Sequence, residues 1–258
     1  MAAVLGKTKD GKQRDQILLN TEKILFRNQV PGIGVIDERR FADFARDMYN
    51  NKEEPAVANK KLEDIVNTAV SVTNIIQSFK YLFTYERGEK GFHRWRCLKY
   101  FLFEYEAHLK LMANETNDKV TLDDFNETTI EHIIPQKYSD NWQDIVDSVT
   151  NGLKEGDNIE KTKVVLINTI GNLTILKNGK NASLGNKGWK EKRERFRTGS
   201  YNEIEISRHE EWTKNSVAQR GVEMLRFLEQ KVTGLNFTGN EIKNTLYFDE
   251  YIAELIDS

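Results

Sequence analysis

The sequence predicts a mainly α-helical protein with one small β-hairpin. Two observations lead to this fold class. Apolar residues recur at helical spacing through most of residues 18–112 and again after residue 189. Between these parts, two short runs, residues 129–135 and 172–176, have β-type composition and are bounded by proline or glycine. We therefore expect a helical N-terminal region followed by a core of two strands and a helix, embedded in further helices.

The first half of the chain is expected to consist of helices joined by turns. A short amphipathic helix precedes a turn at residues 31–34, and Asp37 is expected to cap the next helix. One long apolar row spans residues 62–79 and another spans residues 98–112. Apolar residues at helical spacing most simply form the hydrophobic core, so we assign these rows no catalytic or binding role.

The pattern changes after residue 121. A small helix around Trp142 is expected between the two strands. Three glycines, Gly179, Gly185 and Gly188, predict a loop after the second strand. Further helices are expected at residues 189–196, which are strongly basic, at residues 210–232, and at residues 246–256.

Composition excludes several classes of protein. The chain has 258 residues, of which 38% are hydrophobic and 30% charged, so it can bury a sizeable core. No run approaches the ~20 apolar residues of a membrane span. The single cysteine, Cys97, excludes an intramolecular disulfide and a cysteine-rich zinc site. The first twenty residues lack the apolar segment of a secretory signal, so we expect a cytoplasmic protein.

Charge is distributed unevenly along the chain. The net charge is −2, yet residues 172–198 contain eight lysines and arginines and only two glutamates. A basic segment on a mildly acidic body is the electrostatic pattern of a phosphate-binding surface. A solvated helix face explains the same pattern equally well. The choice between them therefore depends on the chemistry of other residues.

Three residues provide the groups that phosphodiester hydrolysis needs. The imidazole of His132 suits a general base at neutral pH, because an unperturbed histidine has a pKa of ~6.5. Glu131 and Asn181 offer a carboxylate and an amide oxygen, which are hard ligands that fit Mg²⁺ or Mn²⁺ better than structural zinc. Adjacent side chains on a strand point to opposite faces unless the strand twists strongly, so Glu131 and His132 converge only under that condition.

Five segments together resemble a known family. They are Ile-Glu-His-Ile-Ile-Pro-Gln at 130–136, Gly-Asn-Leu-Thr-Ile-Leu at 171–176, Asn181, Leu-Gly-Asn-Lys at 184–187 and Glu-Lys-Arg at 191–193. This ordered set resembles an HNH (ββα-metal) endonuclease. More narrowly, it is similar to the C-terminal nuclease domain of GmrSD-type, modification-dependent restriction enzymes and related phage-defence proteins. The resemblance covers residues 92–230, with a long insertion at residues 137–170.

The resemblance implies a role for each matching residue. His132 would be the general base that activates water, and Asn172 would hold the hairpin loop through hydrogen bonds from its side chain to the backbone. Glu131, where many HNH nucleases have aspartate, would bind the metal. Asn181 would complete the catalytic set and bind the same metal. The implied cofactor is Mg²⁺, with Mn²⁺ as an alternative.

The basic segment supplies candidates for binding nucleic acid. Lys187 and Arg193 are expected to contact phosphates from a helix that opens near Asn186, and Lys190 is a further candidate. The implied substrate is duplex DNA, in modified or unmodified form. A homodimer would suit double-strand cutting by a one-site nuclease. The ParB-like sensor domain that accompanies such nucleases is not expected within this chain, and neither is contact with a membrane.

The expected domain organisation has three parts. Residues 1–117 form a helical region, of which residues 92–117 pack on the nuclease core. Residues 118–235 form the HNH nuclease domain, and residues 236–258 form a C-terminal helical tail.

Two other functions fit the same sequence. The chain is alternatively a catalytically inactive module that binds nucleic acid, or a helical interaction scaffold. A lone histidine is more often a core residue than a catalytic one, but Glu131 and the downstream segments favour the catalytic interpretation of His132. We interpret His93, His108 and His209 as surface or helix-packing residues.

Overall fold

The computed structural model describes residues 6, 8–33, 38–50, 54–84, 91–138, 140–150 and 159–247. For a few of these residues, Asn181 among them, only the backbone is described. The described part is mainly helical and contains one two-stranded antiparallel sheet, which confirms the predicted fold class. None of its helices combines the length and the apolar character needed to cross a membrane.

The chain divides into two compact units. The first contains Met1–Ser78 and Leu228–Phe237, and the second contains Phe79–Phe227 and Thr238–Ser258. The domain boundaries expected near residues 117 and 235 remain predictions.

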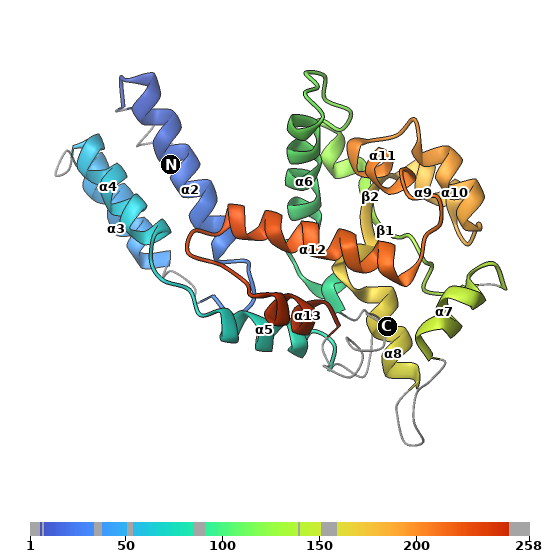
Figure 1. Ribbon diagram of the computed structural model, residues 1–258. Helices are drawn as coiled ribbons and strands as arrows, with labels where there is room; N and C mark the ends of the chain where they lie inside the picture. The colour runs from blue at the N-terminus through green and yellow to red at the C-terminus, as the bar shows by residue number, and fades with distance from the viewer. Residues whose placement is uncertain are drawn as a thin grey trace. The chain divides into compact units, whose positions relative to one another are not determined.

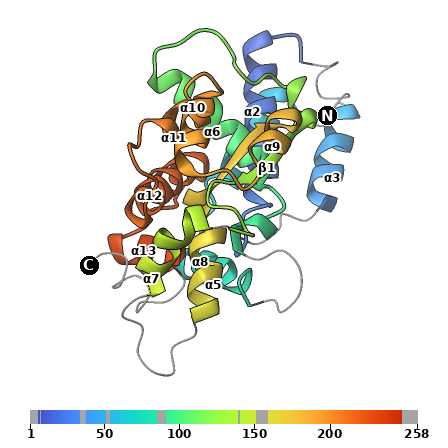
Figure 2. The ribbon, with the colours of Figure 1, turned by 90° about the vertical axis from the view of Figure 1, so that its right-hand side faces the viewer.

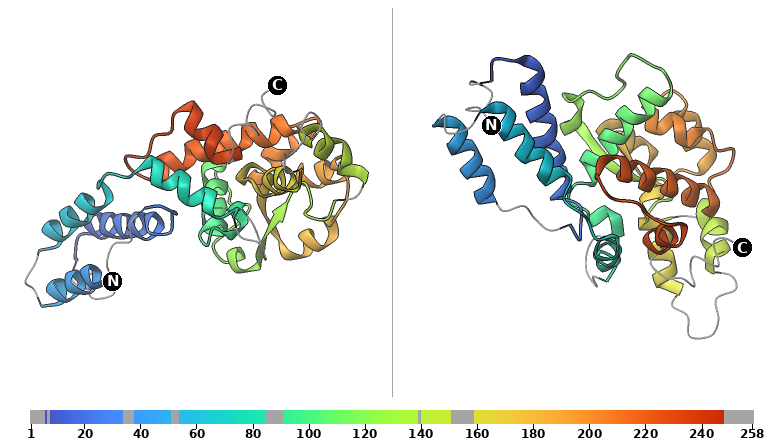
Figure 3. Two further views of the ribbon diagram at one scale, coloured as in Figure 1. Left: turned by 90° about the horizontal axis from the view of Figure 1, so that it is seen from below. Right: turned by 60° about the vertical axis from the view of Figure 1, so that its left-hand side comes forward.

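The first unit is built around three helices, α2 (Gly11–Arg27), α3 (Glu38–Tyr49) and α4 (Pro55–Val66) (Figures 1 and 3). Helices α2 and α4 pack against each other, and α3 packs on α4. The shared core is apolar and consists of Ile17, Ile24, Ala58, Leu62 and Val66, with Phe44 packed against it. The helix cap expected at Asp37 lies outside the described residues.

The apolar row at residues 62–79 is not one helix. Helix α4 ends at Val66, and α5 (Val72–Tyr81) begins after a break. The guanidinium group of Arg27 is buried, and it donates hydrogen bonds to the carbonyls of Val66, at 2.6 Å, and Thr68. A continuous helix would use these carbonyls in its own ladder, so the buried arginine favours the break.

The second unit holds the hairpin and the helices around it. In chain order they are η1 (Gly91–Arg94), α6 (Leu98–Met112), η2 (Asp124–Glu127), β1 (Thr128–His132), η3 (Asp140–Trp142), α7 (Gln143–Thr150), α8 (Ile159–Asn168), η4 (Ile170–Asn172), β2 (Leu173–Lys177), α9 (Asn178–Leu184), α10 (Trp189–Phe196), α11 (Tyr201–Ser207), α12 (Lys214–Lys231) and α13 (Gly239–Tyr247). The last residues of α12 belong to the first unit.

Strands β1 and β2 pair antiparallel, with Thr128 opposite Lys177 and His132 opposite Leu173. Every residue of β2 except Lys177 is buried. Helices α6 and α11 pack against β2, and α9 packs against both strands (Figures 1 and 2). Because helices cover the hairpin, consecutive residues of β2 are buried rather than alternate ones, and these include the polar Thr174.

The loop expected after the second strand is a helix. Helix α9 follows β2 directly, so the backbone of Asn181 is helical rather than part of a loop. The glycines mark helix boundaries. Gly185 follows α9 with a φ of +41°, a left-handed conformation typical of helix C-termini, and Gly188 is the N-cap of α10.

Helix α11 is an element that the apolar pattern does not predict. A capping box begins it: the Ser200 hydroxyl accepts from the Glu203 amide at 3.3 Å, and the Ser200 amide donates to the Glu203 carboxylate at 2.8 Å. Helix α12 begins at Lys214, later than the expected residue 210. Of the helix expected at residues 246–256, the first two residues fall in α13, and residues 248–256 lie outside the described residues.

Candidate active site

Asn172 ties the two halves of the hairpin together at the end where β1 stops. Its side chain accepts from the Ile134 amide at 2.9 Å and donates to the Ile134 carbonyl at 3.1 Å. It also donates to the Ile167 carbonyl at 2.8 Å and accepts from the Trp212 indole at 3.4 Å. The side chain is fully buried. These bonds fix the turn that follows His132, although a contribution of Asn172 to catalysis remains a prediction.

A buried arginine also supports the start of the second strand. Arg220 donates to the carbonyls of Gly171, at 3.1 Å, and Leu173, at 2.6 Å. Its guanidinium group also bonds to Asn202 and forms an ion pair with Glu205 at 2.8 Å. The start of β2 is therefore fixed to α11 and α12.

His132 is the last residue of β1 and is only 7% exposed. Its Nε2 lies 3.2 Å from Oδ1 of Asn168, at the end of α8, and 3.3 Å from Nε2 of Gln136. The amide of Asn168 is oriented by a bond of 2.9 Å from its Nδ2 to the Val164 carbonyl. That bond turns Oδ1 towards the imidazole, which favours the tautomer of His132 with its proton on Nε2. The amide nitrogen of Gln136 is a donor, and its contact with Nε2 favours the opposite tautomer.

A second histidine stacks on the first. The ring of His93, from η1, lies 5.0 Å from the ring of His132 at an interplanar angle of 25°. Burial above all, with the nearby His93 and Lys192, lowers the pKa of His132 to about 4, against the opposing effect of its hydrogen bond with Asn168. The imidazole of His132 is therefore neutral at neutral pH, as a general base must be.

The carboxylate of Glu131 has a different neighbour. Its Oε1 lies 3.0 Å from Nζ of Lys192 in α10, and the side chains of the lysine and the glutamate are 0% and 14% exposed. Burial raises the pKa of Glu131 and lowers that of Lys192, and each charge opposes the effect of burial on the other. Each ionised group is thus stabilised chiefly by its partner.

Asn181 lies on the helix that packs against both strands, but its side chain is outside the described residues. Whether its amide faces Glu131 therefore stays a prediction. Within the described part of the chain, no group of three or more histidines, cysteines, aspartates or glutamates is placed so that it could hold a metal ion. A metal site here would rest on the oxygen donors of Glu131 and Asn181.

The predicted phosphate contacts all lie on α10 or just before it. Asn186 is exposed in the turn after α9, and Lys190 is exposed on α10. Lys187 forms an exposed ion pair with Glu191 at 3.2 Å. Arg193 donates from Nε to the Ser207 carbonyl at 3.1 Å, so contact with a phosphate would have to coexist with this bond.

Three residues around His132 and Glu131 were not predicted from the sequence. Asn168 and His93 reach His132 from elements that precede β2 and β1, and no local pattern identifies them. The sequence indicates only weakly that Lys192 is buried. It lies four residues before the buried Phe196 and therefore on the same, apolar face of a short helix.

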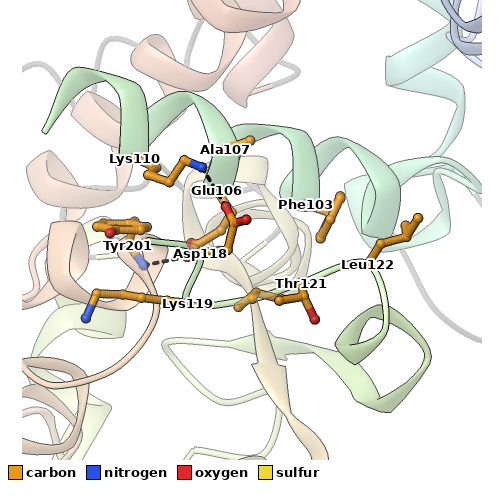
Figure 4. A pocket seen from close by; sticks show the side chains of 10 residues that line it. Phe103, Glu106, Ala107, Lys110, Asp118, Lys119, Thr121, Leu122 and Tyr201 are labelled. Atoms are coloured by element: carbon orange, nitrogen blue, oxygen red, sulfur yellow. Dashed lines mark hydrogen bonds and ion pairs between the residues drawn. The ribbon is translucent and has the colours of Figure 1, made fainter. Parts of the chain in front are cut away.

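A cavity of about 240 Å³ lies elsewhere in the second unit, against α6 (Figure 4). Its charged groups include Lys110 and Asp118, which pair at 2.6 Å, and Lys119, whose Nζ lies 5.4 Å from the ring centre of Tyr201. None of the predicted site residues lines this cavity. The cavity is therefore not part of the candidate site around His132.

Comparison with known proteins identifies the family. No curated protein and no solved structure matches the chain. The family of GmrSD restriction endonucleases, C-terminal domain, matches residues 74–227, a range that includes β1, β2 and every residue placed around His132 above. This match covers more than half of the chain, and the protein therefore belongs to the GmrSD restriction endonuclease C-terminal domain family, whose members are nucleases that act on DNA.

Proposed function

We propose that this nuclease is a metal-dependent endonuclease of the HNH type, with His132 as its general base. The observation that carries the proposal is the state of the imidazole. His132 is buried at the end of β1, its lowered pKa keeps it neutral at neutral pH, and its Nε2 lies 3.2 Å from the acceptor oxygen of Asn168. A neutral imidazole has one unprotonated nitrogen that can accept a proton from water. We propose that the contact with Asn168 prevails over that with Gln136, so that Nε2 is protonated and Nδ1 is this nitrogen.

Positioning of the base depends on two asparagines. Asn168 holds Nε2 of His132 as a donor, so that Nδ1 is the nitrogen that removes the proton from the attacking water. Asn172 fixes the backbone of Ile134, two residues beyond the base. Both asparagines act through hydrogen bonds to groups that do not themselves react, which is the usual way of orienting a catalytic imidazole.

The cofactor that we propose is Mg²⁺, with Mn²⁺ as an alternative, held by the Glu131 carboxylate and the Asn181 amide. The donor set fits a hard cation, because it offers oxygen atoms and no thiolate. Helix α9, which carries Asn181, packs against the strand that carries Glu131. When bound, such a cation would compensate charge on the phosphate and on the leaving 3′ oxygen.

The DNA backbone is proposed to lie along the turn before α10 and the exposed face of that helix. Asn186, Lys187, Lys190 and Arg193 would contact its phosphates. The ion pair of Lys187 with Glu191 is exposed, and exposed pairs contribute only ~0–1 kcal/mol, so a phosphate can replace the glutamate at little cost. Binding should therefore weaken steeply as salt is raised.

A plasmid-nicking assay tests the assignment of the base. The wild-type protein is expected to convert supercoiled plasmid to nicked or linear DNA in Mg²⁺ or Mn²⁺, and EDTA should stop the reaction. His132→Ala should cut at least ~10²-fold more slowly, because general-base catalysis is lost. His108→Gln, which changes a histidine of α6 that is remote from β1 in the chain, is the matched control and should cut normally. Equal cutting by wild type and His132→Ala would refute the assignment.

Two further measurements separate cleavage from simple binding. Gel retardation at low salt should show that His132→Ala still binds DNA as the wild type does. The wild-type nicks should be sealed by a DNA ligase, because attack of water with departure of the 3′ oxygen leaves a 5′-phosphate and a 3′-hydroxyl. Retained binding without cleavage in either metal would instead favour a catalytically inactive binding module.

A further inference from the structure

Lys192 is the only fully buried lysine in the described part of the chain. It lies on α10 and shares the inward face of that helix with Phe196. The other charged residues of α10, such as Lys190 and Glu194, are exposed or partly exposed. Burying a charged lysine is costly unless a specific arrangement of acceptors compensates for the loss of water.

Such an arrangement surrounds its ammonium group. Nζ lies 3.0 Å from Oε1 of Glu131, 3.2 Å from the His132 carbonyl and 3.0 Å from the Ile133 carbonyl. An ammonium group has three hydrogens, and these three acceptors use all of them. Nζ also lies over the Trp142 ring, 5.8 Å from its centre, and the face of the ring favours the positive charge of the ammonium group.

All three acceptors belong to consecutive residues at the end of β1. The lysine is about sixty positions away in sequence, so it fixes this backbone from outside the hairpin. We propose that Lys192 is a positioning residue of the active site, whose ammonium group holds the Glu131 carboxylate and the backbone that carries His132 in their working geometry. This inference rests on the proposed function, because it assumes that Glu131 and His132 do the chemistry.

Lys192 does not contact DNA, since its side chain has no exposed surface. It is distinct in this respect from Lys187 and Lys190, which are at least partly exposed to solvent. Its replacement should therefore lower the turnover number and leave the Michaelis constant for DNA almost unchanged. A replaced phosphate contact would show the opposite pattern.

A double-mutant cycle tests the interaction without reference to cleavage. Lys192→Met keeps most of the unbranched side chain but removes the ammonium group, which leaves the largely buried Glu131 carboxylate without its counter-ion. In EDTA, this variant should melt on the order of 10 °C lower than the wild type. In a Glu131→Gln background the same change should lower the melting temperature far less, because no charge is left unpaired. Lys243→Met, at an exposed lysine of α13, is the matched control and should melt as the wild type does.

Additive shifts in this cycle would overturn the proposal, whether or not the protein cuts DNA. Non-additive shifts in a wild type that proved inactive in every metal would show that Lys192 holds Glu131 and would refute the proposed function instead. The two failures are thus distinguishable. If Lys192→Met does not fold alone, the Lys192→Met/Glu131→Gln double variant still reports the interaction, because it should fold where the single variant does not.

Kinetics and metal binding separate positioning from a general loss of stability. Below its melting temperature, Lys192→Met should nick plasmid at least ~10²-fold more slowly, with a Michaelis constant for DNA within about threefold of the wild-type value. Mn²⁺ binding, followed by the electron paramagnetic resonance signal of the free ion, should persist. Lys192→Arg, which retains the charge, should recover part of the rate. Normal turnover in folded Lys192→Met, or a raised Michaelis constant at normal turnover, would overturn the proposal.

Discussion

Replacing Asn172 tests whether the turn after β1 depends on one side chain. Asn172→Ala removes four hydrogen bonds at once, two to Ile134, one to Ile167 and one to Trp212. The site is fully buried, so water cannot replace the lost partners. A hydrogen bond contributes about 1 kcal/mol net, and an unsatisfied buried group costs about 1–3 kcal/mol. We therefore expect a loss of about 4 kcal/mol in the free energy of unfolding.

Urea unfolding followed by tryptophan fluorescence measures this loss directly. Asn172→Asp sharpens the test, because its shape is the same but its carboxylate cannot donate to the carbonyls of Ile134 and Ile167. This variant should be destabilised at least as much as Asn172→Ala. Asn240→Ala, at an exposed asparagine of α13, should stay within about 0.5 kcal/mol of the wild type. A loss below about 1 kcal/mol in Asn172→Ala would refute the proposed role of these bonds.

Three other predictions concern the second unit. Gly171→Ala should lower the free energy of unfolding by about 3 kcal/mol, because a Cβ there would lie 2.0 Å from a carbonyl oxygen of α12. In Gly239→Ala the added Cβ meets nothing within 4 Å, so this control should melt as the wild type does. Hydrogen bonds from the Thr121 backbone and a lysine of β2 lower the pKa of Asp124 from 3.8 to about 2, so its contribution to stability is present above pH 4 and is lost as the pH falls through 2. Asp124→Asn should therefore melt lower than the wild type at pH 7, and the difference should vanish near pH 2. Asn168→Ala should remove the acceptor that favours the proposed Nε2–H tautomer of His132, a change visible in a long-range ¹H–¹⁵N spectrum, and slow nicking by about tenfold or more.

Local patterns predicted most of the helices and both strands. The apolar row at residues 98–112 coincides with α6, and the basic segment at residues 189–196 coincides with α10. These elements have a clear period and a turn signal at each end, which is the information that local sequence carries best. The strands were found because proline and glycine bound two short β-type runs.

The errors have specific causes. The row at residues 62–79 has the period of one helix, yet the buried guanidinium group of Arg27 binds the carbonyls at the break, and that contact is invisible to local pattern. The glycines after β2 suggested a loop because glycine permits turns, whereas here they mark helix boundaries. Helix α11 was missed although Ser200 and Glu203 form a recognisable capping box.

By itself, the sequence determined the family, the mainly helical class and the order of the residues that resemble a nuclease motif. Those features depend on residue types and their spacing, which need no folded chain. Only the tertiary structure decided which groups surround His132 and Glu131. Asn168, His93 and Lys192 reach them from separate elements, and Lys192 is about sixty residues from its partner. Contacts at such separations arise from packing of whole helices against the hairpin, and no local pattern records them.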